Sequence, residues 1–286
     1  MFFQGEFSMA DAATGAPQIQ GTLPLYKKPE PLNAQLHKGK GLKYGDRPFD
    51  FLNETHFVPV TVGEFASAGG DYPIIFLGES KISVAVMGLQ AGENLFVDSK
   101  TSEYAPFHYV PAFVRRYPFV GAVHTEEKDR FTVCVDTQSH LFSDKPDFEF
   151  FDADGKPTEF TQRAIEFVRR YESDVAVTQL FVDRMKELDM FEEQTTRFQP
   201  RDQAGNPVGE PQVVATYWGL SLKKLSELPS KTLEELRDNS YLGAIYAHVL
   251  SQARWEQIMA RAAFRAGEVT SSSMSRPTMA PPPPEA

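Results

Sequence analysis

The segment Pro73–Gly88, with the sequence PIIFLGESKISVAVMG, decides the fold class. It contains two short runs rich in apolar residues, Pro73–Gly78 and Ile82–Met87, and turn residues bound each of them. Runs of about four to eight apolar and β-branched residues between turn signals are typical of β-strands. The segment therefore predicts two strands and places a β-sheet in the N-terminal half.

Similar runs lie on both sides of this segment. The run of residues 120–124 and the run of residues 131–136 flank a charged turn, Glu126–Asp129, which favours a hairpin. We expect further strands at His56–Thr61, Leu95–Val97, Val120–His124, Phe131–Asp136 and Val213–Trp218.

Helical patterns dominate after Phe150. Thr158 and Thr232 stand where a threonine hydroxyl caps the first turn of a helix. Strands first and helices later favour an α+β fold, with a mixed, largely antiparallel sheet in the N-terminal half followed by helices packed on it. One domain, and a sheet domain followed by a helical domain, both remain open. The expected helices are Glu159–Leu188, Leu233–Asn239 and Leu242–Phe264.

The two ends of the chain differ in composition from the middle. Residues 1–8 resemble the remnant of a protease site and a cloning site, and residues 9–30 predict a flexible arm. Residues 31–266 form the predicted globular domain, and residues 267–286 form a disordered tail rich in Pro and Ser. A docking site for a proline-recognising partner is the other interpretation of this tail.

The net charge limits which partners the chain is expected to bind, and the cysteine content indicates the compartment in which it is expected to reside. The 286 residues carry a formal charge of −10, which disfavours nucleic acid and anionic lipid as partners. The single cysteine, Cys134, forms no intrachain disulfide and fits a reducing compartment. We find no secretion signal and no apolar stretch of about 20 residues. The chain is therefore predicted to be cytoplasmic, without membrane insertion.

An arginine pair stands in an apolar run, Tyr109–Phe119, with the sequence YVPAFVRRYPF. Because an unpaired buried charge is costly, Arg115 and Arg116 must reach water, pair with carboxylates or bind an anion. Adjacent residues of a helical turn project about 100° apart, so one arginine is expected to face a pocket while the other stays in water. The predicted ligand-binding residues are Arg115, Arg116, Tyr109, Tyr117, Phe119 and His248. The alternative is a structural ion pair with Glu103 or Asp98.

Histidines offer weaker candidates for chemistry. His248 and Ser251 share a helix face, and a core histidine and a ligand-contacting histidine both remain open. His124 and Glu126 have the H-x-E spacing that cupin-like iron sites use on a strand, and His140 follows further along the chain. Surface residues are the favoured interpretation of this set, because Glu126 falls in the predicted turn.

Asp152–Gly155 predicts an acidic turn rather than a calcium loop, because Arg163 stands where the loop needs Glu. We expect no metal and no cofactor.

Three segments together resemble the bacterial SapC family: Tyr109–Phe119, Phe151–Thr158 and Tyr246–Ser251. The resemblance spans Leu32–Ala262. After Trp218-Gly219-Leu220 this chain continues with Ser221-Leu222-Lys223, where the family tends to place an aromatic and a basic residue. The resemblance supplies no catalytic residues, because the activity of the family is not established.

The family is named for a surface-layer gene cluster, and some members carry a peptide-transporter permease label. Its members are often encoded beside cupin-like hydroxylases and flavin-dependent halogenases, so the resemblance implies such enzymes as pathway partners. A permease is excluded by the lack of a membrane-spanning stretch.

Three functions remain open. The first is a soluble accessory protein that binds a peptide or a small anionic molecule in a modification or uptake pathway. The second is an enzyme with an unrecognised histidine-based site, using His124, Glu126 and His140, or His248. The third is a secreted surface-layer component.

Overall fold

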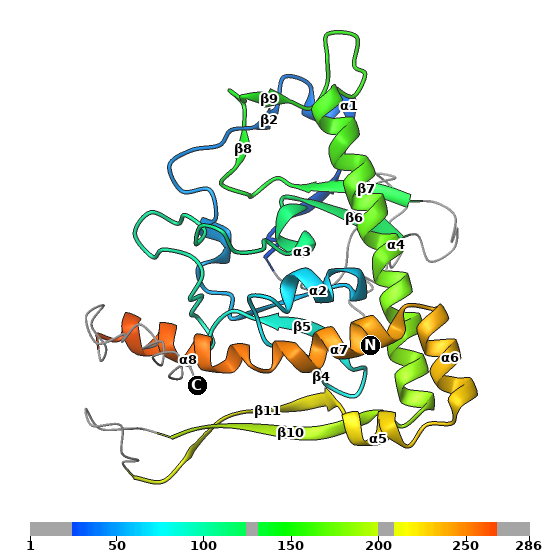
Figure 1. The fold of residues 1–286 in the computed structure, drawn as a ribbon. Helices are drawn as coiled ribbons and strands as arrows, with labels where there is room; N and C mark the ends of the chain where they lie inside the picture. Colours follow the sequence, from blue (N-terminus) through cyan, green and yellow to red (C-terminus); the bar gives the residue numbers. More distant parts are fainter. Residues whose placement is uncertain (1–24, 124–130, 200–208, 268–286) are drawn as a thin grey trace, which may run out of the picture.

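The computed structural model describes residues 25–123, 131–199 and 209–267. The described chain has antiparallel sheets in its first half and its main helices in the second half, which confirms the α+β prediction. Figure 1 shows the sheets stacked along the molecule, with one long helix, α4 (Glu159–Glu187), running down one side.

The largest sheet in the described part of the chain has five antiparallel strands. The two runs of Pro73–Gly88 form its central hairpin, in which Ile75 pairs with Val84. This pairing confirms the two strands predicted there. In spatial order the strands are β10 (Phe191–Phe198), β11 (Gln212–Leu220), β4 (Ile74–Leu77), β5 (Ile82–Val86) and β3 (Phe57–Pro59).

Two smaller sheets complete the β-structure of the described residues. The strands predicted on either side of residues 126–129 are confirmed as an antiparallel pair, because Val120 pairs with Cys134. The predicted strand Leu95–Val97 is wrong: Val97 forms an isolated bridge with Tyr104. One sheet has the strand order β1 (Pro29–Pro31), β7 (Phe131–Asp136), β6 (Phe119–Val123). The other has the order β8 (Phe142–Ser143), β2 (Gly41–Leu42), β9 (Phe148–Glu149).

The helices correct two sequence predictions. Thr158 caps α4 by accepting from the backbone N–H of Thr161, as expected. Thr232 lies inside the first turn of α6 (Ser230–Asp238) instead of capping it, and its N–H donates to the carbonyl of Pro229. The predicted helix Leu242–Phe264 is two helices, α7 (Tyr241–Ser251) and α8 (Arg254–Arg265).

The residues at the break between α7 and α8 form hydrogen bonds with the edge of β4. Strand β11 pairs with β4 only between Trp218 and Phe76, so the backbone of Ile74 has no strand partner on that side. The Ser251 hydroxyl accepts from the Ile74 N–H at 2.9 Å, and the Gln252 amide donates to the Ile74 carbonyl at 2.7 Å. The residues of this turn therefore take the place of a neighbouring strand.

Two apolar cores meet along α4. Val168 packs into the core under the three-stranded sheet of β6 and β7. Tyr171 and Phe181 pack into the core under the five-stranded sheet. The remaining short helices are α1 (Ala34–His37), α2 (Phe65–Ala68), α3 (Ala112–Arg115) and α5 (Leu222–Ser226), with 3-10 turns η1 (Asp50–Leu52) and η2 (Val62–Glu64).

Candidate functional site

The structure separates the two adjacent arginines. Arg115 is exposed and folds back on its own segment: its Nε donates to the Val110 carbonyl at 2.9 Å, and its Nη2 donates to the Tyr109 hydroxyl at 3.2 Å. Its guanidinium also lies over the Phe167 ring, 5.2 Å from the centroid. Arg115 therefore stays at the surface.

Arg116 is buried, with a relative exposure of 6%. Its Nη1 donates to Oε1 of Glu172 at 3.0 Å. The guanidinium lies 4.3 Å from the ring centroid of Tyr171 and 4.7 Å from that of Phe113, so two aromatic faces hold it. Its Nε has no hydrogen-bond partner within residues 25–123, 131–199 and 209–267.

The ion pair of Arg116 is not the one that the sequence predicted. Neither Glu103 nor Asp98 pairs with Arg116 in the described part of the chain. Asp98 instead accepts from backbone N–H groups of its own turn, including that of Lys100 at 2.8 Å. The actual partner, Glu172, lies in the middle of α4 and far along the chain.

Burial dominates the electrostatics of this pair. Burial raises the pKa of the Glu172 carboxyl, and the nearby Arg116 guanidinium only partly offsets that rise. Burial also opposes the charge of Arg116, but its ring and carboxylate neighbours keep its pKa above the ordinary value. Arginine stays cationic at any physiological pH. The site therefore holds a fixed cation beside a carboxyl group that burial makes easier to protonate.

A cavity of about 140 Å³ lies beside the pair. Arg116 and Glu172 line it together with apolar side chains from the five-stranded sheet and from α4, such as Ile82 and Val175. The Arg116 side chain is only 5% exposed, whereas the Glu172 side chain is 27% exposed. The cavity thus lies where the two sheets and α4 meet.

Gly121 on β6 makes room for the carboxylate. A Cβ at this position would lie 2.7 Å from the Phe131 ring and 2.9 Å from Cγ of Glu172. These distances are shorter than real Cβ contacts, so any larger residue at position 121 displaces Glu172 or Phe131. Glycine suits this position because the Phe131 ring and the Glu172 side chain both come close to it.

A second buried carboxylate, Glu64, supports the segment that carries Arg116. Its Oε2 accepts from the N–H and the hydroxyl of Thr61, which forms a capping box for η2. Its Oε1 accepts from the Tyr109 hydroxyl at 2.9 Å and from the Ala112 N–H at 2.6 Å. Glu64 therefore fixes the start of α3, directly before the arginines.

Neither Glu172 nor Glu64 was among the site residues predicted from the sequence. The spacing Thr61-x-x-Glu64 is a capping-box signature that could have identified Glu64. No local signal identifies Glu172, which is partly buried in a charged helix whose other glutamates and arginines are mostly exposed.

Tyr109, Tyr117 and Phe119 do not line the cavity in the described chain. Tyr109 binds Glu64. Tyr117 stacks on Phe51, with centroids 3.9 Å apart, and Phe119 packs edge-to-face on Phe150. These contacts are with other residues than Arg116, and a direct role of the three rings in binding stays a prediction.

The structure places His248 in the core under the five-stranded sheet, apart from the Arg116 cavity. Its Nε2 accepts from the Leu220 N–H at 3.0 Å, and its Nδ1 has no partner among the described residues. Burial lowers the pKa of His248 to about 4. The neighbouring Ser251 donates to the His248 carbonyl at 2.6 Å and so is not activated by the ring.

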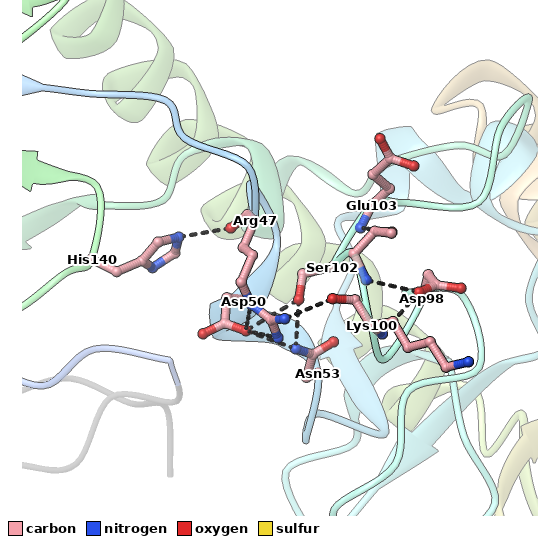
Figure 2. Close-up of polar contacts among 9 residues, drawn as sticks. Arg47, Asp50, Asn53, Asp98, Lys100, Ser102, Glu103 and His140 are labelled. Carbon is pink, nitrogen blue, oxygen red and sulfur yellow. Dashed lines mark hydrogen bonds and ion pairs between the residues drawn. The ribbon is translucent and has the colours of Figure 1, made fainter.

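His140 belongs to a surface network, shown in Figure 2. One of its ring nitrogens, Nε2, lies 3.0 Å from the backbone oxygen of Arg47. The Arg47 guanidinium pairs with Asp50 at 2.6 Å, which lowers the pKa of that carboxyl. Asn53 and Ser102 donate to the same carboxylate. The network ties two loops together.

A metal site finds no support in the described ranges. No group of three or more His, Cys, Asp or Glu side chains within them is arranged to hold a metal ion. His124 and Glu126 lie outside the described residues, so the proposed set with His140 stays a prediction. Asp152 and Gly155 form the expected acidic turn, with Gly155 at φ +77°.

The family of the chain is shown by a comparison with known protein families. The SapC family model matches residues 32–258, most of the chain, so the chain belongs to the SapC family. No curated protein and no solved structure matches it. Among the described residues, no helix has the length and apolar character to cross a membrane.

Proposed function

We propose that this SapC-family chain is a binding protein for a small ligand that carries a carboxylate, and that Arg116 holds the acid group in the cavity beside α4. The observation that carries the proposal is a buried guanidinium that lines a cavity with one carboxylate partner and an Nε without a partner among the described residues. A buried donor without a partner costs about 1–3 kcal/mol. We expect a ligand oxygen to remove this cost once binding opens a path from the cavity to Nε.

The surroundings of Arg116 favour recognition of an acid group. The planar fork of arginine binds the two oxygens of a carboxylate together. Tyr171 and Phe113 hold the guanidinium in place, so little rotamer freedom is lost on binding. The apolar walls exclude water and strengthen the charge interaction.

Calorimetric titration with formate, acetate and propionate tests this proposal. We expect the wild type to bind at least one of them at pH 7. Arg116→Lys keeps the charge but loses the fork, and a loss of affinity of about tenfold or more is expected. Arg115→Lys is the matched control and should bind like the wild type, because Arg115 lies outside the cavity.

A second variant separates a lost site from a damaged fold. Val175→Phe fills the cavity from α4 without changing either charge. We expect it to abolish binding while the circular dichroism spectrum stays that of the wild type. The proposal is wrong if the folded wild type binds neither these three acids nor any other carboxylate-bearing probe that fits the cavity, or if Val175→Phe binds them unchanged.

The pathway setting goes beyond this site. Cupin-like hydroxylases and flavin-dependent halogenases as partners, and a cytoplasmic location, stay predictions. Co-purification of the tagged chain from its own cells, followed by fractionation, is the measurement that checks both.

A further inference from the structure

The cavity presents charges of both signs. Arg116 contributes a cation on a side chain that is 5% exposed, and Glu172 contributes a carboxyl group on a side chain that is 27% exposed. A ligand with only a carboxylate would meet attraction from one group and repulsion from the other. A ligand that carries an acid and an amine would match both groups.

The hydroxyl groups of the cavity's Ser83 and Thr178 are already engaged. The Ser83 hydroxyl donates to the Val60 carbonyl at 2.7 Å. The Thr178 hydroxyl donates to the Asp174 carbonyl and accepts from the Val62 N–H. Both hydroxyl groups therefore have little remaining hydrogen-bonding capacity for a ligand.

Lys81 also lines the cavity, but its ammonium group has another partner. The Nζ atom lies 3.5 Å from the ring centroid of Trp218 on β11. A cation held on an indole face is not directed at the ion pair. Of these groups, Arg116 and Glu172 are left to recognise a charged ligand.

The volume of the cavity and its apolar lining limit the size and polarity of the uncharged part of the ligand. A cavity of about 150 Å³ takes a molecule of the size of benzene. The volume of about 140 Å³ next to the ion pair therefore suits a molecule between alanine and valine in size. Apolar walls from Ile82, Val175 and Val182 suit an aliphatic side chain.

From this charge pattern and volume we infer that the ligand is a small aliphatic α-amino acid, with its carboxylate on Arg116 and its ammonium group on Glu172. The inference rests on the proposed function and deepens it by naming the class of ligand. Without ligand, Arg116 and Glu172 pair with each other. The bound amino acid supplies an anion to Arg116 and a cation to Glu172, so neither side chain is left unpaired when the ligand binds.

Three probes that differ by one group test the inference in calorimetric titrations. They are L-valine, its deaminated analogue 3-methylbutanoate and its decarboxylated analogue 2-methylpropylamine. We expect L-valine to bind at least tenfold more tightly than either analogue. L-tryptophan, which exceeds the cavity, should not bind.

The variant Glu172→Gln makes the test specific for the amine. Glutamine keeps the shape and can still accept from Arg116, but it has no charge for an ammonium group. We expect L-valine to lose about tenfold or more in affinity and 3-methylbutanoate to gain, which reverses the order of the wild type.

The outcomes distinguish the inference from the proposed function. If 3-methylbutanoate or acetate binds the wild type as tightly as L-valine does, or if Glu172→Gln leaves the order unchanged, the amino-acid inference is overturned and the carboxylate site stands. If neither the simple acids nor L-valine bind the folded wild type, both are overturned.

Discussion

Replacing the members of the buried ion pair one at a time should give unequal losses of stability. Glu172→Met leaves the Arg116 guanidinium unpaired at 5% side-chain exposure, whereas Arg116→Met leaves a Glu172 side chain that is 27% exposed. Breaking a buried pair costs about 3–5 kcal/mol when the remaining charge has no access to water. We therefore expect a loss of about 3 kcal/mol for Glu172→Met, at the low end of this range.

The loss for Arg116→Met should be smaller, about 1–2 kcal/mol, because the remaining carboxyl group reaches water and takes up a proton more readily. The double variant replaces the pair by apolar side chains, which is often close to neutral. Its loss should therefore fall below that of Glu172→Met alone, so the two losses are far from additive.

Urea unfolding followed by circular dichroism at pH 7 measures all three free energies. Independent sites add within about 0.5 kcal/mol. If the two single losses are equal and sum to the loss of the double variant within that margin, the reasoning about this pair is refuted. Repeating the cycle in high salt is a further check, since a buried pair is screened much less than a surface pair.

Three further predictions concern the surroundings of the site and the core. Gly121→Ala should destabilise the fold by about 1–3 kcal/mol, because the new Cβ meets the Phe131 ring and Cγ of Glu172; urea unfolding measures this loss, and an unchanged free energy of unfolding would contradict the close approach. Burial depresses the pKa of His248 to about 4, so the unfolded chain takes up this proton first and stability should fall by about 3 kcal/mol as the pH drops from about 6.5 to 4. The comparison with His248→Gln isolates this contribution, and equal pH profiles would exclude it. Burial raises the pKa of Cys134 to about 12, so the folded protein should resist iodoacetamide at pH 8 and react only in denaturant, as mass spectrometry would show.

Local sequence patterns predicted much of the fold. The runs of Pro73–Gly88 became β4 and β5, the strands on either side of residues 126–129 paired as β6 and β7, and Thr158 capped α4. These predictions succeeded because alternation, turn residues and caps act over a few neighbouring residues. The family resemblance, carried by three segments, agreed with the match over residues 32–258.

Predictions that depended on distant packing failed. The helix Leu242–Phe264 looked continuous, but the chain turns at Gln252 so that this side chain can bind the backbone of Ile74. Thr232 looked like a cap, but the helix begins one turn earlier, after Pro229. The sequence pattern was compatible with either start of α6, whereas the break at Gln252 depends on a contact with the distant strand β4.

At the candidate site, too, local sequence predicted one part and tertiary packing decided the other. The sequence alone marked Arg115 and Arg116 as cations that need a partner, because the free energy of an unpaired buried charge depends on residue type and apolar surroundings. Only the tertiary structure decided that Arg116 turns inward, that Glu172 pairs with it and that a cavity opens beside them. The physical reason is that these residues are far apart in the chain, so their side chains meet only when α4 packs beside the segment that carries Arg116.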